Sequence, residues 1–147
     1  MDTKTLANRL AARYLTRNPF DIAENKNFII LRVPLVEVRG FSQYIKRCGV
    51  IYINEALDEQ QQKIVCAHEL GHLVMHKDCN RIFMDTRTFI KTSPFETEAH
   101  HFAVDLIYDD SDMRTYLEYE PDTVARCLGI SREQAEYRLS TVEPMLW

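Results

Sequence analysis

The sequence lacks the features that would place a protein in a membrane or on nucleic acid. No window of about 18 residues is free of charged side chains and apolar throughout, so we expect no transmembrane helix. The N-terminal residues carry charges at short intervals and contain no uninterrupted apolar stretch, so we expect no secretory signal. The formal net charge is −4, which gives no bulk attraction for nucleic acid. We therefore expect a cytoplasmic protein that contacts neither membrane nor nucleic acid directly.

Cysteine is also sparse, and its spacing gives no CxxC pair. The four cysteines are scattered along the chain, at Cys48, Cys66, Cys79 and Cys127. Two disulfides would be conceivable in an oxidising compartment, but with no secretory signal expected we predict reduced thiols. Cys66 lies inside an apolar run and is predicted to serve packing. The sequence shows no internal repeat and no low-complexity tract.

Hydrophobic periodicity and turn residues predict an α+β domain. Helices are expected over residues 3–17, from the cap at Asp58 to about residue 77, after Ser93-Pro94, and as a pair over 121–139 around Gly129. Strands are expected within 27–38, interrupted at Pro34, and over 49–54; residues 41–48 fit either a strand or a loop, and 81–90 could hold a short strand. We predict a single domain over residues 1–147, made of an N-terminal helix and connector (1–26), a catalytic core (27–110) and a C-terminal helix pair (111–147).

The stretch "IVCAHELGHLVMHKD" over residues 64–78 carries the clearest chemical signal. His68 and His72 are four residues apart, so on a helix they lie on one face and can both reach one cation. His-Glu-x-x-His on a helix is typical of zinc sites in which the metal lowers the pKa of a bound water and Glu69 takes its proton. Two histidines on a solvated helical face are the alternative, but the apolar flanks place this helix in the core. We predict one Zn²⁺ ion bound by His68 and His72, with Glu69 as the catalytic base.

A catalytic zinc site needs a third protein ligand, and three acidic residues are candidates. Asp78 lies six residues after His72, but a ligand there needs a sharp turn, and the glycine that would make it is absent. Glu96 and Glu98 lie at the start of the helix that follows. Glu98 is preferred because it lies one turn before Phe102 and next to the small Ala99, whereas Glu96 is interpreted as a charge that stabilises the helix dipole.

The motifs "AHELGHLVMH" and "ETEAHHFAVDLI" resemble the ImmA/IrrE family of metallopeptidases, in which a His-Glu-x-x-His helix is followed by a Glu-Ala-Asn-x-Phe-Ala helix. The flanking "GVIYIN" and "VARCLGISREQAEYRL" are similar to that family as well, so the resemblance covers roughly residues 45–140. It departs from the family at His100, where asparagine is usual, and at residues 107–110, "IYDD", where Leu-Met-Pro is usual.

The resemblance implies a small zincin-like fold and a gluzincin-like ligand set of His68, His72 and Glu98, with Glu69 as acid and base. Family members typically cleave a helix-turn-helix repressor encoded beside them in prophages, mobile elements or stress operons, and some are paired with such regulators as toxin and antitoxin. The resemblance therefore implies a zinc endopeptidase of narrow specificity whose partner is a transcriptional repressor.

Two other functions compete with this interpretation. "TVARCLGISREQAEYRL" has the spacing of a helix-turn-helix, and Arg132, Gln134 and Arg138 would then face DNA; the net charge favours a structural helix pair or a partner-docking surface instead. A catalytically silent zinc protein that binds a regulator would carry the same motif.

Several further roles are predicted around the zinc. His76, one turn beyond His72, is expected to support the site from outside or to lie on the surface. Tyr52, Tyr108 and the nearby histidines are candidates for stabilising the oxyanion. The strand "GVIYIN" is expected to offer a sheet edge to which an extended substrate adds. The surface from Arg126 to Arg138 is expected to help recognise the partner.

Overall fold

The computed structural model describes residues 1–77, 83–86 (backbone only) and 93–145. Their contacts gather in two compact units, Met1–Ile107 and Tyr108–Trp147. The boundary between them lies close to residue 111, where the sequence predicts the C-terminal helix pair to begin. Whether the whole chain behaves as one domain stays a prediction.

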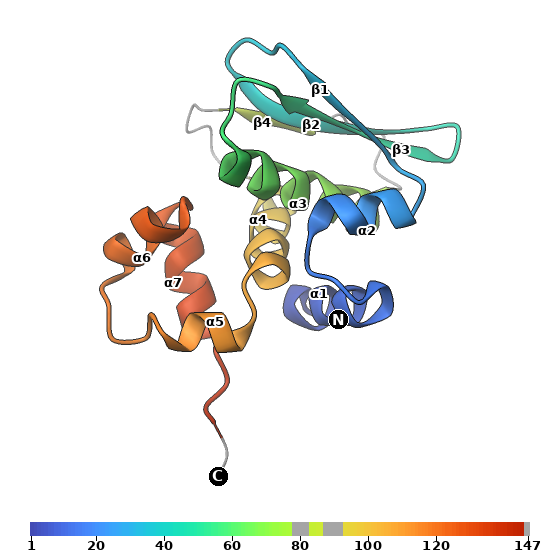
Figure 1. The fold of residues 1–147 in the computed structure, drawn as a ribbon. Helices are drawn as coiled ribbons and strands as arrows, with labels where there is room; N and C mark the ends of the chain where they lie inside the picture. The colour runs from blue at the N-terminus through green and yellow to red at the C-terminus, as the bar shows by residue number, and fades with distance from the viewer. Residues whose placement is uncertain (78–82, 87–92, 146–147) are drawn as a thin grey trace. The chain divides into compact units, whose positions relative to one another are not determined.

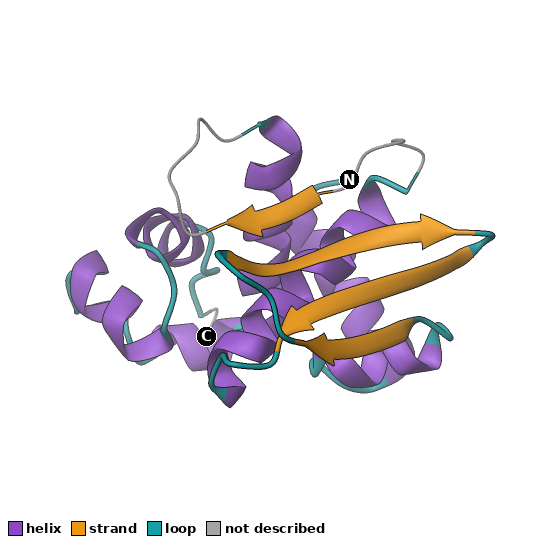
Figure 2. Cartoon of the chain, turned by 90° about the horizontal axis from the view of Figure 1, so that it is seen from above, coloured by secondary structure: helices purple, strands orange, loops and turns teal. Residues whose placement is uncertain are grey.

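The first unit contains a four-stranded sheet in the order β1-β3-β2-β4 (Figure 2). Its strands are β1 (Ile29–Val33), β2 (Val38–Ile45), β3 (Cys48–Asn54) and β4 (Phe83–Thr86). β3 pairs in parallel with β1 and antiparallel with β2, and β2 pairs antiparallel with β4. The predicted strands are therefore present, residues 41–45 belong to a strand, and the short strand predicted within 81–90 is β4; the other residues of that range lie outside the described part.

Four helices of the first unit lie on one side of this sheet (Figure 1). They are α1 (Thr3–Tyr14), α2 (Pro19–Asn25), α3 (Glu59–Met75) and α4 (Pro94–Ile107). α3 packs against β2 and β3, and α4 packs against α3. The helix α2 was not predicted. Residues 15–18 separate it from α1, and the side chain of Asn18 accepts a hydrogen bond from the backbone N–H of Phe20 at 2.9 Å. Asn18-Pro19 therefore starts a second helix as well as following the first.

Close packing of α3 on the sheet depends on Gly40 in β2. A Cβ atom at Gly40 would lie 2.5 Å from Cγ1 of Val65, so the face of the sheet that Gly40 belongs to is the one that meets α3. Ile53 is paired with Gly40 and lies on that same face, while Tyr52, the next residue in β3, lies on the opposite one. The ring of Tyr52 stacks on Phe41 there, with 4.3 Å between centroids.

The two helices that carry the predicted site begin where the sequence indicates. The side chain of Asp58 accepts from the backbone N–H of Gln61 at 2.8 Å and caps α3, whose middle part, residues 64–73, is entirely buried. The hydroxyl of Ser93 accepts from the backbone N–H of Glu96 at 3.3 Å at the start of α4. Both caps are local features, which is why the sequence predicts them correctly.

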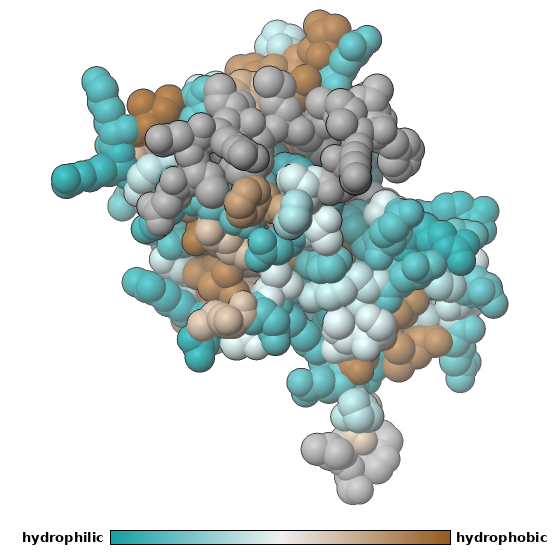
Figure 3. All heavy atoms as spheres, turned by 180° about the vertical axis from the view of Figure 1, so that it is seen from behind, coloured by the Kyte–Doolittle hydropathy of each residue, from teal (hydrophilic) through white to brown (hydrophobic). Residues whose placement is uncertain are grey.

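The second unit consists of α5 (Asp110–Arg114), α6 (Pro121–Leu128) and α7 (Arg132–Ser140). Gly129 ends α6 in the left-handed region at φ 72°, and Ser131 forms the capping box of α7 with Gln134. The predicted helix pair is therefore present. In the described part of the chain no helix has the length and apolar character needed to cross a membrane. On the face drawn in Figure 3, hydrophobic residues form small groups among hydrophilic ones.

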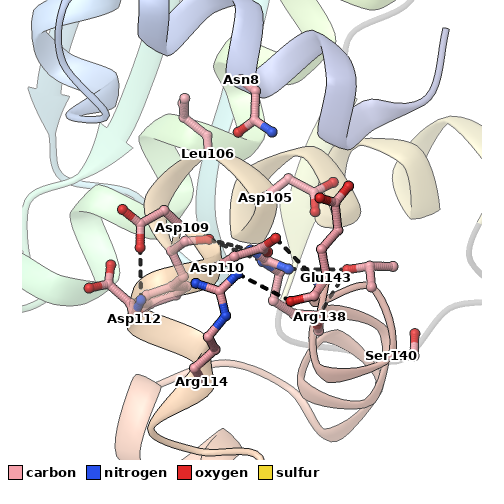
Figure 4. A network of polar contacts seen from close by, with 12 residues as sticks. Asn8, Asp105, Leu106, Asp109, Asp110, Asp112, Arg114, Arg138, Ser140 and Glu143 are labelled. Atoms are coloured by element: carbon pink, nitrogen blue, oxygen red, sulfur yellow. Dashed lines mark hydrogen bonds and ion pairs between the residues drawn. The ribbon is translucent and has the colours of Figure 1, made fainter. Parts of the chain in front are cut away.

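Arg138 is the central polar residue of this second unit (Figure 4). Its side chain is 1% exposed, and its Nε and Nη2 donate to the carbonyl oxygen of Tyr108 at 3.0 and 2.9 Å. Nη2 also pairs with Oδ1 of Asp110 at 2.6 Å. The expectation that Arg138 belongs to a docking surface is therefore wrong, because its side chain is buried and its charge is paired inside the unit.

Candidate metal centre

The structure brings three of the predicted residues together on one buried stretch of α3. His68, Glu69 and His72 are at most 2% exposed. The imidazoles of His68 and His72 meet edge to face, with 4.9 Å between ring centroids, as expected for positions one helical turn apart. Oε2 of Glu69 lies 3.9 Å from Nε2 of His68. The carboxylate of Glu69 thus lies next to the histidine pair, beyond hydrogen-bond distance of His68.

Glu96 from α4 completes this group. Its Oε1 lies 2.8 Å from Nε2 of His72, and its Oε2 lies 3.0 Å from Nε2 of His68. One carboxylate therefore spans the same ring nitrogen of both histidines. Because α4 packs against α3, the first turn of α4 delivers this acid to the histidines from a neighbouring helix.

Glu98 does not reach the histidine pair, so the predicted ligand set disagrees with the geometry. Its carboxylate is 52% exposed, and its Oε1 lies 3.5 Å from Nε2 of His76 rather than near His68 or His72. Asp78, the remaining candidate, lies outside the described residues. The contacts of Glu96 with both histidines show that it is more than a helix-dipole charge, and Glu96, not Glu98, lies where the third ligand was expected.

The physical reason lies in the stripe of α4 that faces α3. Residues two apart on a helix point in very different directions, so Glu96 and Glu98 cannot share a face. Glu96, Ala99 and Ala103 follow the i, i+3, i+7 spacing of one stripe, and both alanines are fully buried. The small side chains let the helices approach closely, as does Gly71 of α3, where an added Cβ would lie 2.8 Å from Cδ1 of Phe102. The alanine spacing was the signal in the sequence that favoured Glu96.

His100 also belongs to this neighbourhood. Its ring lies 4.3 Å from that of His68, centroid to centroid, and it follows Glu96 by one helical turn. Burial lowers the pKa of His100 to about 3, so its imidazole is neutral at pH 7. The residue at which this sequence departs from the family pattern is thus placed beside the candidate ligands, where a neutral ring can donate or accept one hydrogen bond.

Glu96 and His72 hold the protonation states that a cation requires. Burial alone would raise the pKa of Glu96, but hydrogen bonds with His68 and His72 outweigh it and hold that pKa well below the ordinary value. Burial lowers the pKa of His72 by more than the contact with Glu96 raises it. At neutral pH the carboxylate is therefore ionised and the imidazole neutral, which are the forms that bind metal.

The donor set fits one small divalent ion. Zn–N and Zn–O bonds are about 2.0–2.2 Å long, so two atoms that share a zinc ion are at most about 4 Å apart. Glu96 meets this condition with both histidines. Two groups of three residues can each bring one ligand atom within 4.8 Å of the others, namely His68, Glu69 and His72, and His68, Glu96 and His100. Imidazole nitrogen and carboxylate oxygen are ligands that zinc accepts readily.

The hydroxyls of the two tyrosines proposed for the oxyanion have partners outside the candidate ligand set. Tyr52 lies on the face of the sheet opposite α3, with its hydroxyl 3.5 Å from Oε1 of Gln43. The hydroxyl of Tyr108 is buried in the second unit, where it donates to the carbonyl oxygen of Leu128 at 3.0 Å. The position of Tyr52 does not support the predicted role, and the hydroxyl of Tyr108 is occupied within the second unit. Of the nearby histidines, His100 lies beside the candidate ligands.

The strand "GVIYIN" does not offer a sheet edge. It forms most of β3, which is paired with β1 on one side and β2 on the other, so a peptide cannot add to it. The outer strands among the described residues are β1 and β4, and β4 contacts α3. The prediction of strand addition to β3 is therefore wrong, because the pairing order depends on strands that are distant in the sequence.

The second unit is poorly suited to reading DNA bases. Gln134 is 8% exposed, and its side chain accepts from the backbone N–H of Ser131 at 2.9 Å as part of the capping box. Arg138 is held inside the unit. Of the three residues that would face DNA, Arg132 alone is exposed, and it pairs with Asp122 and Glu136. A recognition helix should present its polar side chains outward.

The chain is similar to known proteins over most of its length. The family model of the IrrE N-terminal-like domain matches residues 23–140. The chain is 35% identical over 138 residues to the "Uncharacterized immunity region protein 2" of Bacillus phage phi105, covering 92% of this chain and 87% of that protein. It is 29% identical over 133 residues to "Metallopeptidase ImmA" of Bacillus subtilis (strain 168), covering 86% of this chain and 78% of that protein. The chain therefore belongs to the ImmA/IrrE family of metallopeptidases.

Proposed function

We propose that this protein is a zinc endopeptidase of narrow specificity that cleaves a helix-turn-helix repressor. The observation that carries the proposal is that the carboxylate of Glu96 lies within 3.0 Å of Nε2 of both His68 and His72, beside the buried carboxylate of Glu69. The similarity to a phage immunity region protein and to ImmA supports a role in phage or mobile-element regulation. The repressor substrate follows from the family resemblance.

In this proposal His68, His72 and Glu96 would hold the zinc ion, with Glu96 in place of the Glu98 predicted from the sequence. Zinc in such a site polarises a carbonyl and lowers the pKa of water. Glu69 takes a proton from the attacking water and passes it to the leaving amine. His100, whose ring lies 4.3 Å from that of His68, is proposed to donate a hydrogen bond to the substrate carbonyl.

The edge of the sheet at β4 is proposed to hold the substrate. Among the described residues β4 pairs with β2 on one side and lies at the end of the strand order, so its outer backbone groups are proposed to bind an extended peptide. Because β4 contacts α3, a peptide added there runs above the helix that carries the histidines. Main-chain pairing does not select a sequence, so selectivity rests on additional contacts with the partner. Among these, the exposed Arg132 remains a candidate.

The test of the function is Glu69→Gln assayed with the helix-turn-helix regulator encoded nearest to the gene. The variant should bind one equivalent of zinc and keep its unfolding midpoint, but lose cleavage by at least about 100-fold, since a general base typically contributes 10²–10⁴. Glu59→Gln, an exposed change in the first turn of the same helix, is the matched control and should cleave normally. Regulator binding without cleavage by the wild type would instead identify a catalytically silent zinc protein, and casein digestion would contradict narrow specificity.

The ligand choice has its own test. Glu96→Ala should lose the bound zinc equivalent, whereas Glu98→Ala should retain it at saturating zinc. The reverse pattern would restore the original assignment of Glu98 and refute the geometry used here.

A further inference from the structure

His76 forms an unusual contact with the candidate ligand His72. Nδ1 of His72 lies 3.0 Å from Nδ1 of His76, and the two rings are 5.2 Å apart, centroid to centroid. His76 is the C-cap residue of α3 and is 6% exposed, and its backbone N–H donates to the carbonyl oxygen of His72 at 2.7 Å. On its other side its ring meets that of Phe95, 4.7 Å away. The imidazole of His76 is therefore held in place by two helices.

The hydrogens of these rings can be assigned from the geometry. His72 turns its Nε2 toward Glu96, so with a metal at Nε2 its single N–H is at Nδ1. That N–H then donates to Nδ1 of His76, which must be the acceptor and carries its own hydrogen at Nε2. Nε2 of His76 faces Oε1 of Glu98 at 3.5 Å, so the hydrogen of His76 points at a carboxylate.

We infer that His76 and Glu98 are positioning residues that hold His72 in its metal-binding orientation and tautomer. The inference rests on the proposed metal site, and it gives Glu98 a role outside the ligand set. Partners of this kind raise the basicity of a ligating imidazole, and their loss typically weakens metal binding about 10- to 100-fold. Glu98 is half exposed and 3.5 Å from His76, so its contribution should be the smaller of the two.

The test is zinc affinity, measured by competition with a chromogenic chelator and without any substrate. His76→Leu keeps an apolar side chain against Phe95 but removes the acceptor for Nδ1 of His72, so zinc should bind about 10- to 100-fold more weakly, still at one equivalent. His76→Asn places a polar atom near the original Nδ1 and should recover most of the affinity. Glu98→Gln should weaken binding by less than about 10-fold, and Glu59→Gln should not change it.

Cobalt substitution separates positioning from general damage to the fold. The visible absorption of the Co²⁺-loaded protein should shift in His76→Leu and return toward the wild-type spectrum in His76→Asn, while the metal-free proteins unfold at similar temperatures. Equal zinc affinity and equal spectra for wild type, His76→Leu and His76→Asn would overturn the inference while leaving the proposed function intact. Loss of the zinc equivalent in Glu98→Gln would show Glu98 to be a ligand, and a wild-type protein that binds no zinc would contradict both proposals.

Discussion

Replacing Arg138 with methionine should severely destabilise the C-terminal unit, although the sequence suggests an exposed basic residue there. The change removes the ion pair with Asp110 and the two hydrogen bonds to the carbonyl oxygen of Tyr108. Breaking one partner of a buried pair typically costs about 3–5 kcal/mol. Methionine restores part of the packing of the arginine stem, so we expect a loss of about 3 kcal/mol in the free energy of unfolding.

Arg132→Met is the matched control for this substitution. Arg132 also makes two ion pairs, with Asp122 and Glu136, but its side chain is 56% exposed. Exposed pairs contribute about 0–1 kcal/mol, so this variant should stay within about 1 kcal/mol of the wild type. Urea unfolding followed by circular dichroism measures both variants. If Arg138→Met lost no more stability than Arg132→Met, the assignment of Arg138 as a buried structural residue would be refuted.

Three further predictions concern the first unit and the thiols. His100 alone should cost the metal-free protein about 1 kcal/mol of stability between pH 7 and 5.5. Burial lowers its pKa in the folded protein to about 3, so the unfolded chain binds more protons as the pH falls below about 6.5. Urea titrations should show a shallower pH dependence for His100→Asn than for the wild type. Gly71→Ala should lower stability by about 1 kcal/mol. The contact of the added Cβ with Phe102 at 2.8 Å costs about 1–3 kcal/mol, while the higher helix propensity of alanine stabilises by about 1 kcal/mol. A raised melting temperature would contradict the packing described. Iodoacetamide should label the exposed Cys127 in the native protein but not the buried Cys66, whose thiol pKa is raised by burial. If mass spectrometry found Cys66 modified, α3 would have to open readily.

Local signals in the sequence predicted local structure well. The caps at Asp58 and Ser131 and the left-handed Gly129 lie where the sequence places them, because each depends on residues within one helical turn. The spacing of His68 and His72 likewise fixes their common face before any tertiary contact is known.

The incorrect predictions from the sequence were those that depended on contacts between residues far apart in the chain. Glu98 was preferred over Glu96 because it lies one turn before Phe102 and next to Ala99. Both of these residues are buried, and Phe102 does meet α3 at Gly71, but Glu96 reaches the histidine pair while the half-exposed Glu98 lies near His76. Periodicity alone shows that a helix has a buried side but not which neighbour each part of that side meets.

Strand order and the burial of Arg138 could not be predicted either, because both depend on contacts between residues far apart in the chain. The central position of β3 depends on parallel pairing with β1, across the whole of β2, and no local pattern encodes that pairing. Arginine is usually exposed, and Arg138 is buried because Tyr108, just before α5, supplies a carbonyl oxygen and Asp110, at the start of α5, supplies a carboxylate.

The central claim is that one zinc ion is held by His68, His72 and Glu96 beside Glu69. An anomalous difference map at the zinc edge, from crystals of the zinc-loaded protein, tests it most directly. The account predicts one peak in the first unit, bonded to Nε2 of His68, Nε2 of His72 and the carboxylate of Glu96, with Glu98 beyond bonding distance. A peak coordinated by Glu98 or His76 in place of Glu96, or zinc-loaded crystals with no peak at this histidine pair, would contradict it.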